Sequence, residues 1–287
     1  MAVTSASETW AQELEPRALT NLPIGTNFAF IGYGHISGNS LLDPSLPLED
    51  FSARLNSITA GYARAISIFG VSGKVDAYVP FVGGDWTFLN EGAEDLDTST
   101  GFGDLRVRLG VNFVGAPALK AAQFASYKQD VVIGAAVQVF VPTGTYHNTQ
   151  LPNIGSNRWA FRNSIGVSKT FDRWVFEGYA AIWLFTDNTD FLEGKTLAQA
   201  PLFGLKLHGV RKLGGGKWLS LDLGYGAGAR GTVNDVKKDN RINTIRFGCT
   251  LSIPFGRHSL KFSAASSLRI EKGNDLDAFA ITYLVRW

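Results

Sequence analysis

The closing stretch of the chain, DAFAITYLVRW (residues 277–287), alternates large apolar side chains with small or polar ones up to its last residue. The apolar set is Phe279, Ile281, Tyr283, Val285 and Trp287. Successive side chains of a β-strand point to opposite faces, so this stretch predicts a strand with one continuous apolar face. On the other face Leu284 is the exception among small or polar residues. Because chain ends are usually frayed and polar, we expect this strand to face an apolar environment.

The same alternation, complete or partial, recurs along the chain and predicts about twelve strands. Their expected spans are 26–36, 54–67, 70–82, 103–114, 130–141, 159–170, 174–186, 202–212, 217–230, 241–254, 257–270 and 275–287. Long connections, such as 83–100, 142–157 and 186–201, alternate with short ones such as FDR and FGRH. Long loops at one end and short turns at the other are typical of outer-membrane β-barrels.

One connection on the short-turn side is longer than this rule predicts. It is VGAPALKAAQFASYKQD, residues 114–130. Its alanine-rich part between Pro117 and Lys128 favours a short helix on the periplasmic side.

Composition limits the classes of protein that fit. The chain has 287 residues, of which 45% are hydrophobic and only 18% charged, and its net charge is +2. That charge is too small to indicate a nucleic-acid partner. The single cysteine, Cys249, excludes an intrachain disulfide, and the sequence predicts neither a metal site nor a cofactor. No apolar run reaches the ~18 residues of a membrane-spanning helix.

A soluble β-sandwich would also show alternation, so the two classes must be separated by other features. The apolar faces often run for four or five residues, and the opposite faces are rich in Arg, Lys, Gly and Ser. Aromatic residues near the expected strand ends fit the girdles of a membrane barrel. These are Trp86, Trp159, Trp174, Trp218 and Trp287. Together they favour a closed antiparallel transmembrane β-barrel of all-β class.

Several stretches, in order along the chain, resemble a bacterial outer-membrane family of transporters associated with the meta-pathway of phenol degradation. They are ELEPRALTNLPIGTNF, DPSLPLEDF, GYAR, GFGDLRVRLGVNFVGAPAL, NIGSNRWAF, GVSKTF and FTDNTDFLEGKTLAQAPL. The resemblance extends from about Glu13 to Trp287. It implies an outer-membrane barrel and, with less weight, a link to aromatic compounds. The family offers no catalytic motif to transfer.

The resemblance also sets expectations for organisation and location. Residues 1–25 are expected to form an N-terminal periplasmic segment and residues 26–287 the barrel. The chain start carries no recognisable signal peptide, and AQELEPR resembles the start of the family's mature region. We expect location in the bacterial outer membrane, contacts with its lipids and lipopolysaccharide, and recognition of the C-terminal strand by the barrel-assembly machinery.

Charged residues at every second position of a strand predict which of its faces lines the interior. In GDLRVRLGVNF, for example, Arg106 and Arg108 oppose an apolar face that begins at Leu105. The candidate solute-binding lumen residues are Lys74, Asp76, Arg106, Arg108, Arg162, Glu177, Lys206 and Arg246, with Asp104, Asp222, Lys261 and Arg269 as further interior charges. Such charges can pair across the lumen and brace the barrel, or their excess of cations can favour anions.

Three functions remain open from the sequence. The favoured one is an outer-membrane channel for passive passage of small solutes, aromatic or anionic compounds among them. The second is a structural or adhesive barrel without transport. The third, a lipid hydrolase, is disfavoured, because no Ser–His–Asn arrangement is recognisable and His208 fits an inward hydrogen-bonding role. No catalytic residue is therefore predicted.

Overall fold

The computed structural model describes residues 15–39, 48–90, 93–150, 152–269 and 275–287. Twelve antiparallel strands close into a barrel, with β4 and β5 counted as two parts of one strand because both pair with β3. The wall consists of β1 Asn27–Asn39, β2 Leu48–Ile68, β3 Val71–Asn90, β4 Ala93–Phe102, β5 Leu105–Pro117, β6 Val131–Val141, β7 Ala160–Phe171, β8 Trp174–Phe185, β11 Leu202–Gly214, β12 Lys217–Gly228, β15 Ile242–Phe255, β16 His258–Arg269 and β17 Asp275–Arg286. The predicted fold class and strand number are confirmed.

The last strand closes the barrel against the first. Phe28 of β1 pairs with Arg286 of β17, and the pairing continues to Asn39 and Asp275. Asn27, the first residue of β1, and Trp287, just after β17, exchange two backbone hydrogen bonds, of 2.9 and 3.1 Å. Pairing between the terminal strands satisfies backbone groups that lipid could not. Recognition of this strand by assembly machinery stays a prediction.

Side chains are distributed inside out compared with a soluble protein. Large apolar residues cover the outer wall: Leu221, for instance, is 69% exposed. Inside, charged residues such as Asp76 and Arg106 are buried. On β17, Phe279 and Tyr283 face outward, whereas Thr282 and Leu284 line the lumen, as the alternation predicts. An apolar exterior of this kind suits hydrocarbon.

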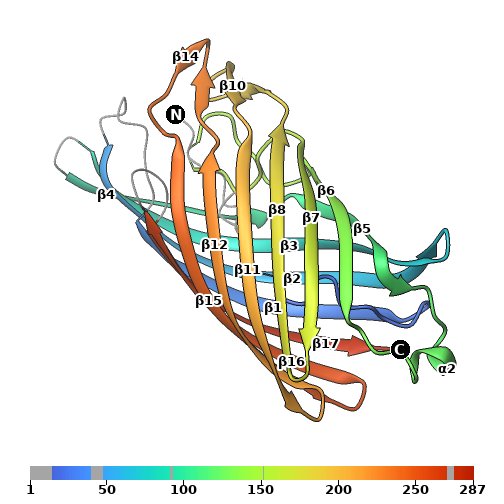
Figure 1. The fold of residues 1–287 in the computed structure, drawn as a ribbon. Helices are drawn as coiled ribbons and strands as arrows, with labels where there is room; N and C mark the ends of the chain where they lie inside the picture. Colours follow the sequence, from blue (N-terminus) through green and yellow to red (C-terminus); the bar gives the residue numbers. More distant parts are fainter. Residues whose placement is uncertain (1–14, 40–47, 91–92, 151, 270–274) are drawn as a thin grey trace.

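The two ends of the barrel differ in the way predicted (Figure 1). At one end lie the C-terminus and α2 (Ala121–Phe124), so the expected helix between β5 and β6 is confirmed. Tight turns join β2 to β3, β7 to β8, β11 to β12 and β15 to β16 at this end. No helix among the described residues is both long and apolar enough to cross a membrane.

At the opposite, outer end one loop prediction is wrong. Residues 83–100 are not a long loop, because β3 continues to Asn90 and β4 pairs with it from Ala93 onward. Apolar and polar residues alternate only over 85–88, and most of the remaining side chains are polar, so the sequence pattern does not reveal this hairpin. Further along the chain, β9 (Asn188–Phe191), β10 (Lys195–Gln199), β13 (Gly231–Val233) and β14 (Val236–Lys237) form a separate small sheet.

An apolar cluster lies where this small sheet meets the wall. Phe191, Leu197 and Val233 of the small sheet pack with Ile154 of the loop after β6 and with wall residues. Those wall residues are Ile36, Ala53, Leu55, Val82, Trp86 and Leu276. The outer end of the barrel therefore holds a buried apolar core, while charge concentrates deeper in the lumen.

Candidate functional site: the barrel lumen

The chain segment that precedes β1 lies inside the barrel. We call residues 15–24 the inward segment. The Ile24 N–H donates to the Leu119 carbonyl over 2.9 Å at the short-turn end. Further in, Leu19 packs against Ala116 and Val132. The division of the chain at residue 25 stays a prediction, and the described part of the expected periplasmic segment contacts the inner wall.

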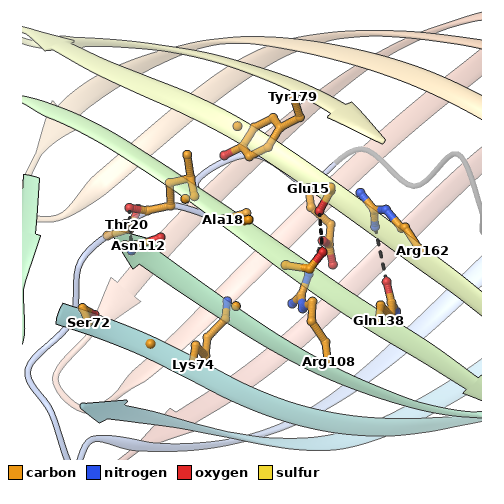
Figure 2. A pocket seen from close by; sticks show the side chains of 18 of the residues that line it. Glu15, Ala18, Thr20, Ser72, Lys74, Arg108, Asn112, Gln138, Arg162 and Tyr179 are labelled. Atoms are coloured by element: carbon orange, nitrogen blue, oxygen red, sulfur yellow. Dashed lines mark hydrogen bonds and ion pairs between the residues drawn. The ribbon is translucent and has the colours of Figure 1, made fainter. Parts of the chain in front are cut away.

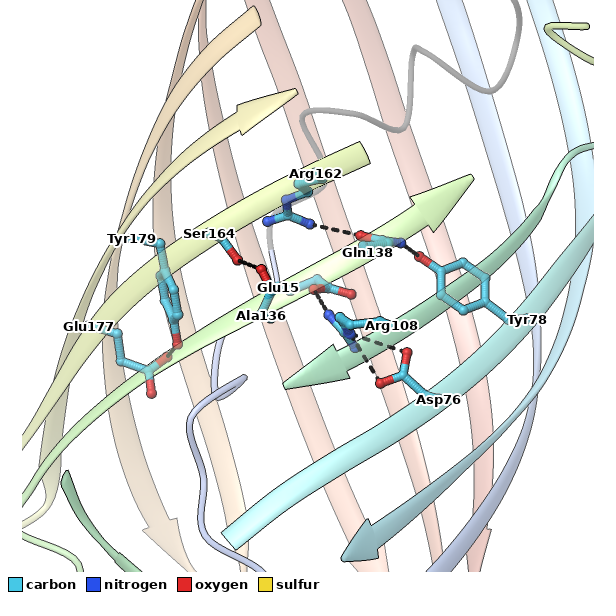
Figure 3. A network of polar contacts seen from close by, with 10 residues as sticks. All are labelled: Glu15, Asp76, Tyr78, Arg108, Ala136, Gln138, Arg162, Ser164, Glu177 and Tyr179. Carbon is cyan, nitrogen blue, oxygen red and sulfur yellow. Dashed lines mark hydrogen bonds and ion pairs between the residues drawn. The ribbon is translucent and has the colours of Figure 1, made fainter. Parts of the chain in front are cut away.

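Two further contacts hold the deep end of the inward segment. The Arg17 N–H donates to Glu177 Oε2 over 2.6 Å. Glu15 Oε2 lies 2.5 Å from Arg108 Nη1 of β5. Arg108 Nε also donates to Asp76 of β3, at 3.0 Å from Oδ2, so one guanidinium joins two carboxylates (Figure 3). Charge-assisted hydrogen bonds of this kind are stronger than neutral ones.

Glu15 stays ionised because cations surround it. Burial alone would raise the pKa of its carboxyl. Arg108, Arg162, Lys206 and Lys74 act in the opposite direction and together hold that pKa well below its usual range. The inward segment therefore carries a negative charge into a cationic part of the lumen.

The inward segment separates two cavities. The larger, of about 430 Å³, lies toward β1–β3 and β15–β17, and the smaller, of about 60 Å³, lies toward β5–β8. Glu15, Thr20, Lys74 and Arg108 line both, which places the segment between them. Figure 2 shows the lining of the smaller cavity. A solute crossing the barrel would have to pass beside this segment.

The structure brings most of the predicted lumen residues to these cavities. Lys74 and Arg108 line both cavities, Asp76 and Arg106 line the larger one, and Arg162 and Lys206 line the smaller one. Glu177 is buried beneath the inward segment, bonded to Arg17, Ser168 and Tyr179. Arg246 is buried on the inward face of β15 and lines neither of these two cavities. Their role in solute binding stays a prediction.

A second chain of polar contacts joins β7, β6 and β3. Arg162 Nη1 donates to Gln138 Oε1 over 3.4 Å, and Gln138 Nε2 donates to the Tyr78 hydroxyl over 2.8 Å (Figure 3). The guanidinium of Arg162 also lies 5.1 Å from the Trp183 ring centroid, a favourable cation–π distance. Arg162 therefore connects β7 to its neighbours, and which of the two roles the lumen charges have stays a prediction.

Sequence reasoning missed Glu15 and the aromatic part of the lining. Phe28, Phe30, Tyr78 and Trp218 all line the larger cavity. The Phe30 and Tyr78 rings lie 6.1 Å apart, and they can do so because Gly61 has no Cβ between them. The alternation along β1 would have placed Phe28 and Phe30 on the inward face. Glu15 precedes the first strand, and no periodic pattern indicates its position.

His208 has the inward hydrogen-bonding role that the sequence predicts. Its Nδ1 lies 2.7 Å from Asp222 Oδ1, and the Ser220 hydroxyl donates to the other carboxylate oxygen over 3.1 Å. Within the described residues, His208 Nε2 has no hydrogen-bond partner. Ser220 is thus bonded to the carboxylate rather than to the imidazole that would have to activate it.

Solved structures with this fold are outer-membrane barrels. An outer membrane channel from Pseudomonas putida F1 matches with a TM-score of 0.81 and 21% identity, covering 96% of this chain and 100% of that one. The translocator domain of the autotransporter NalP from Neisseria meningitidis gives a TM-score of 0.55 at 10% identity, covering 98% and 96%. The monoaromatic hydrocarbon channel TodX gives 0.51 at 8% identity, covering 95% and 92%.

These likenesses concern the fold. With the apolar outer wall and the closed sheet, they place the chain in the bacterial outer membrane. No sequence match was found among curated proteins. A family model, described as "Putative MetA-pathway of phenol degradation", matches residues 44–281, and the chain belongs to this family.

Proposed function

We propose that this protein is an outer-membrane channel through which small solutes, aromatic compounds among them, pass passively. The observation that carries the proposal is the cavity of about 430 Å³ inside the barrel. Its volume falls in the usual range of small-molecule sites, and its lining combines aromatic rings with a few charged groups. A barrel that served only as a scaffold has no need of such a space.

Family membership and fold support this proposal. The family description refers to phenol degradation, and two solved structures of this fold are channels, one of them for monoaromatic hydrocarbons. We further propose that the chain is not an enzyme, since the Ser220 hydroxyl is bonded to Asp222 and not to His208. Of the predicted lumen charges, the solute would contact those that line the larger cavity, which are Lys74, Asp76, Arg106 and Arg108.

Planar-bilayer recording tests the channel directly. The wild-type protein should give discrete current steps, and the reversal potential in a salt gradient should indicate a preference for anions. Neutralising Arg106, Arg108 and Arg246 together should reduce that preference. The matched control replaces three cations that line neither cavity, Lys195, Lys217 and Lys237, and should leave selectivity unchanged. Flat traces from correctly folded protein would favour the structural or adhesive alternative.

A further inference from the structure

The larger cavity is unbalanced in charge. Its lining contains the carboxylates of Glu15 and Asp76, and Arg108 binds both. The other cations that line it are Arg17, Lys74, Arg106 and Lys261. Within the part of the chain that the structure describes, neither Lys74 nor Lys261 has an ion-pair partner. An ammonium withdrawn from bulk water is stabilised by an anion nearby, so this lining favours a negatively charged occupant.

The strand register places hydrogen-bonding groups on both sides of Lys261. Ser252 of β15 is its partner on one side and Thr282 of β17 its partner on the other. All three residues line the larger cavity. Gly32 lies opposite Thr282 on β1 and adds no side chain that would fill this part of the lumen. One ammonium between two hydroxyl groups can donate several hydrogen bonds to a carboxylate.

An apolar surface lies next to this polar row. Leu284 follows Thr282 on the same face of β17, and Phe30 of β1 is its register partner. Tyr78 continues the surface, with its ring 6.1 Å from that of Phe30. On the other side of the row, Trp218 is the register partner of Ser252. The cavity thus presents a cationic, hydroxyl-lined patch flanked by aromatic and aliphatic side chains.

We propose that this cavity is a binding site for one amphipathic monoanion, a carboxylate whose head group contacts Lys261, Ser252 and Thr282 and whose apolar part packs on Phe30 and Leu284. The proposal rests on the proposed function and specifies the class of solute that the channel holds. A neutral aromatic molecule would leave the ammonium without a partner. A small anion such as acetate would leave the apolar surface uncovered, and binding therefore requires both parts.

Calorimetric titration of the full chain in a neutral maltoside detergent tests this site. The probe is benzoate, with benzyl alcohol as the uncharged analogue and acetate as the analogue without a ring. Wild-type protein should bind benzoate at least tenfold more tightly than either analogue. Lys261→Gln should weaken benzoate binding at least tenfold, whereas Lys217→Gln, which removes an exposed lysine, should not change it.

Two results would overturn the proposal: equal binding of benzoate and benzyl alcohol, or wild-type affinity in Lys261→Gln. Should that variant fail to fold, Thr282→Val replaces it, with at least threefold weaker benzoate binding expected and unchanged affinity counting against the site. Bilayer currents without benzoate binding would overturn the site and leave the channel standing. Benzoate binding without currents would support the site and contradict the channel.

Discussion

Arg108 of β5 binds Glu15 of the inward segment, with 2.5 Å between Nη1 and Oε2. The two residues are far apart in sequence and meet in the middle of the lumen only because the inward segment folds back into the barrel. Since the same guanidinium also binds Asp76, this contact connects the segment to the wall at β3 and β5. Movement of the segment must break it.

Replacing Glu15 with Gln should loosen the inward segment. The change removes a charge-assisted hydrogen bond, which contributes about 1.5–3 kcal/mol. We expect a severalfold rise in mean single-channel conductance or in open probability, measured in planar bilayers. Glu193→Gln, which removes an exposed carboxylate at the outer end, should leave both unchanged. A conductance of Glu15→Gln equal to wild type would show that the segment does not limit the pore.

Mildly acidic pH should not raise the conductance in the way that Glu15→Gln does. Surrounding cations lower the pKa of Glu15, so its contribution is fully present above the ordinary value of 4.5 and declines only as the pH falls toward the lower folded value. Conductance should therefore stay constant between about pH 8 and pH 5 as far as this contact is concerned. An increase confined to wild type over that range, and absent in Glu15→Gln, would contradict the low pKa.

The Asp104 carboxylate should hold the loop that follows β6 in its folded conformation. This carboxylate is almost fully buried and accepts hydrogen bonds from the Gly144 N–H (2.9 Å), the Ser156 N–H (3.0 Å) and the Ser156 hydroxyl (2.5 Å). Asp104→Asn leaves a buried donor facing an amide NH₂ group, at a cost of about 1–3 kcal/mol. We expect faster cleavage within residues 142–157 in a limited proteolysis time course. Asp130→Asn, an exposed site, is the matched control.

A methyl group at Gly61 should destabilise the lumen lining. A Cβ there would lie 2.4 Å from Phe30 Cζ and 2.6 Å from Tyr78 Cβ. Overpacking of this kind costs about 1–3 kcal/mol, so Gly61→Ala should lower the urea midpoint of the refolded barrel. Gly178→Ala should not, because a Cβ at that position would have Leu207 Cδ2 as its nearest neighbour, at an ordinary contact distance of 3.5 Å.

The lipid-facing wall provides a test of membrane placement. Leu221 of β12 is 69% exposed on the outer wall. An arginine near the bilayer midplane costs about 2–4 kcal/mol, and the cost falls toward the interfaces. Leu221→Arg should therefore reduce the free energy of unfolding from liposomes far more than Leu96→Arg, which alters an exposed residue of β4. Equal effects would argue that β12 does not cross the hydrocarbon core.

The strands of the barrel wall could be predicted from sequence, because apolar and polar residues that alternate along a strand show which face each side chain occupies. Residues 277–287 alone indicate the closing strand, its outer face and the inward exception Leu284. The position of Glu15 could not be predicted, since it depends on contacts with Arg108 that periodicity does not encode. The hairpin over 83–100 was also missed, because polar residues typical of loops can occupy strands that extend outside a membrane.

The most direct test of the central claim is entry of radiolabelled benzoate into proteoliposomes at pH 8, where the solute is ionised and crosses lipid slowly. Vesicles containing wild-type protein should fill severalfold faster than empty vesicles, and those containing Glu15→Gln should fill faster still. Entry at the rate of empty vesicles, with the barrel shown to be folded and inserted, would contradict the assignment of a solute channel.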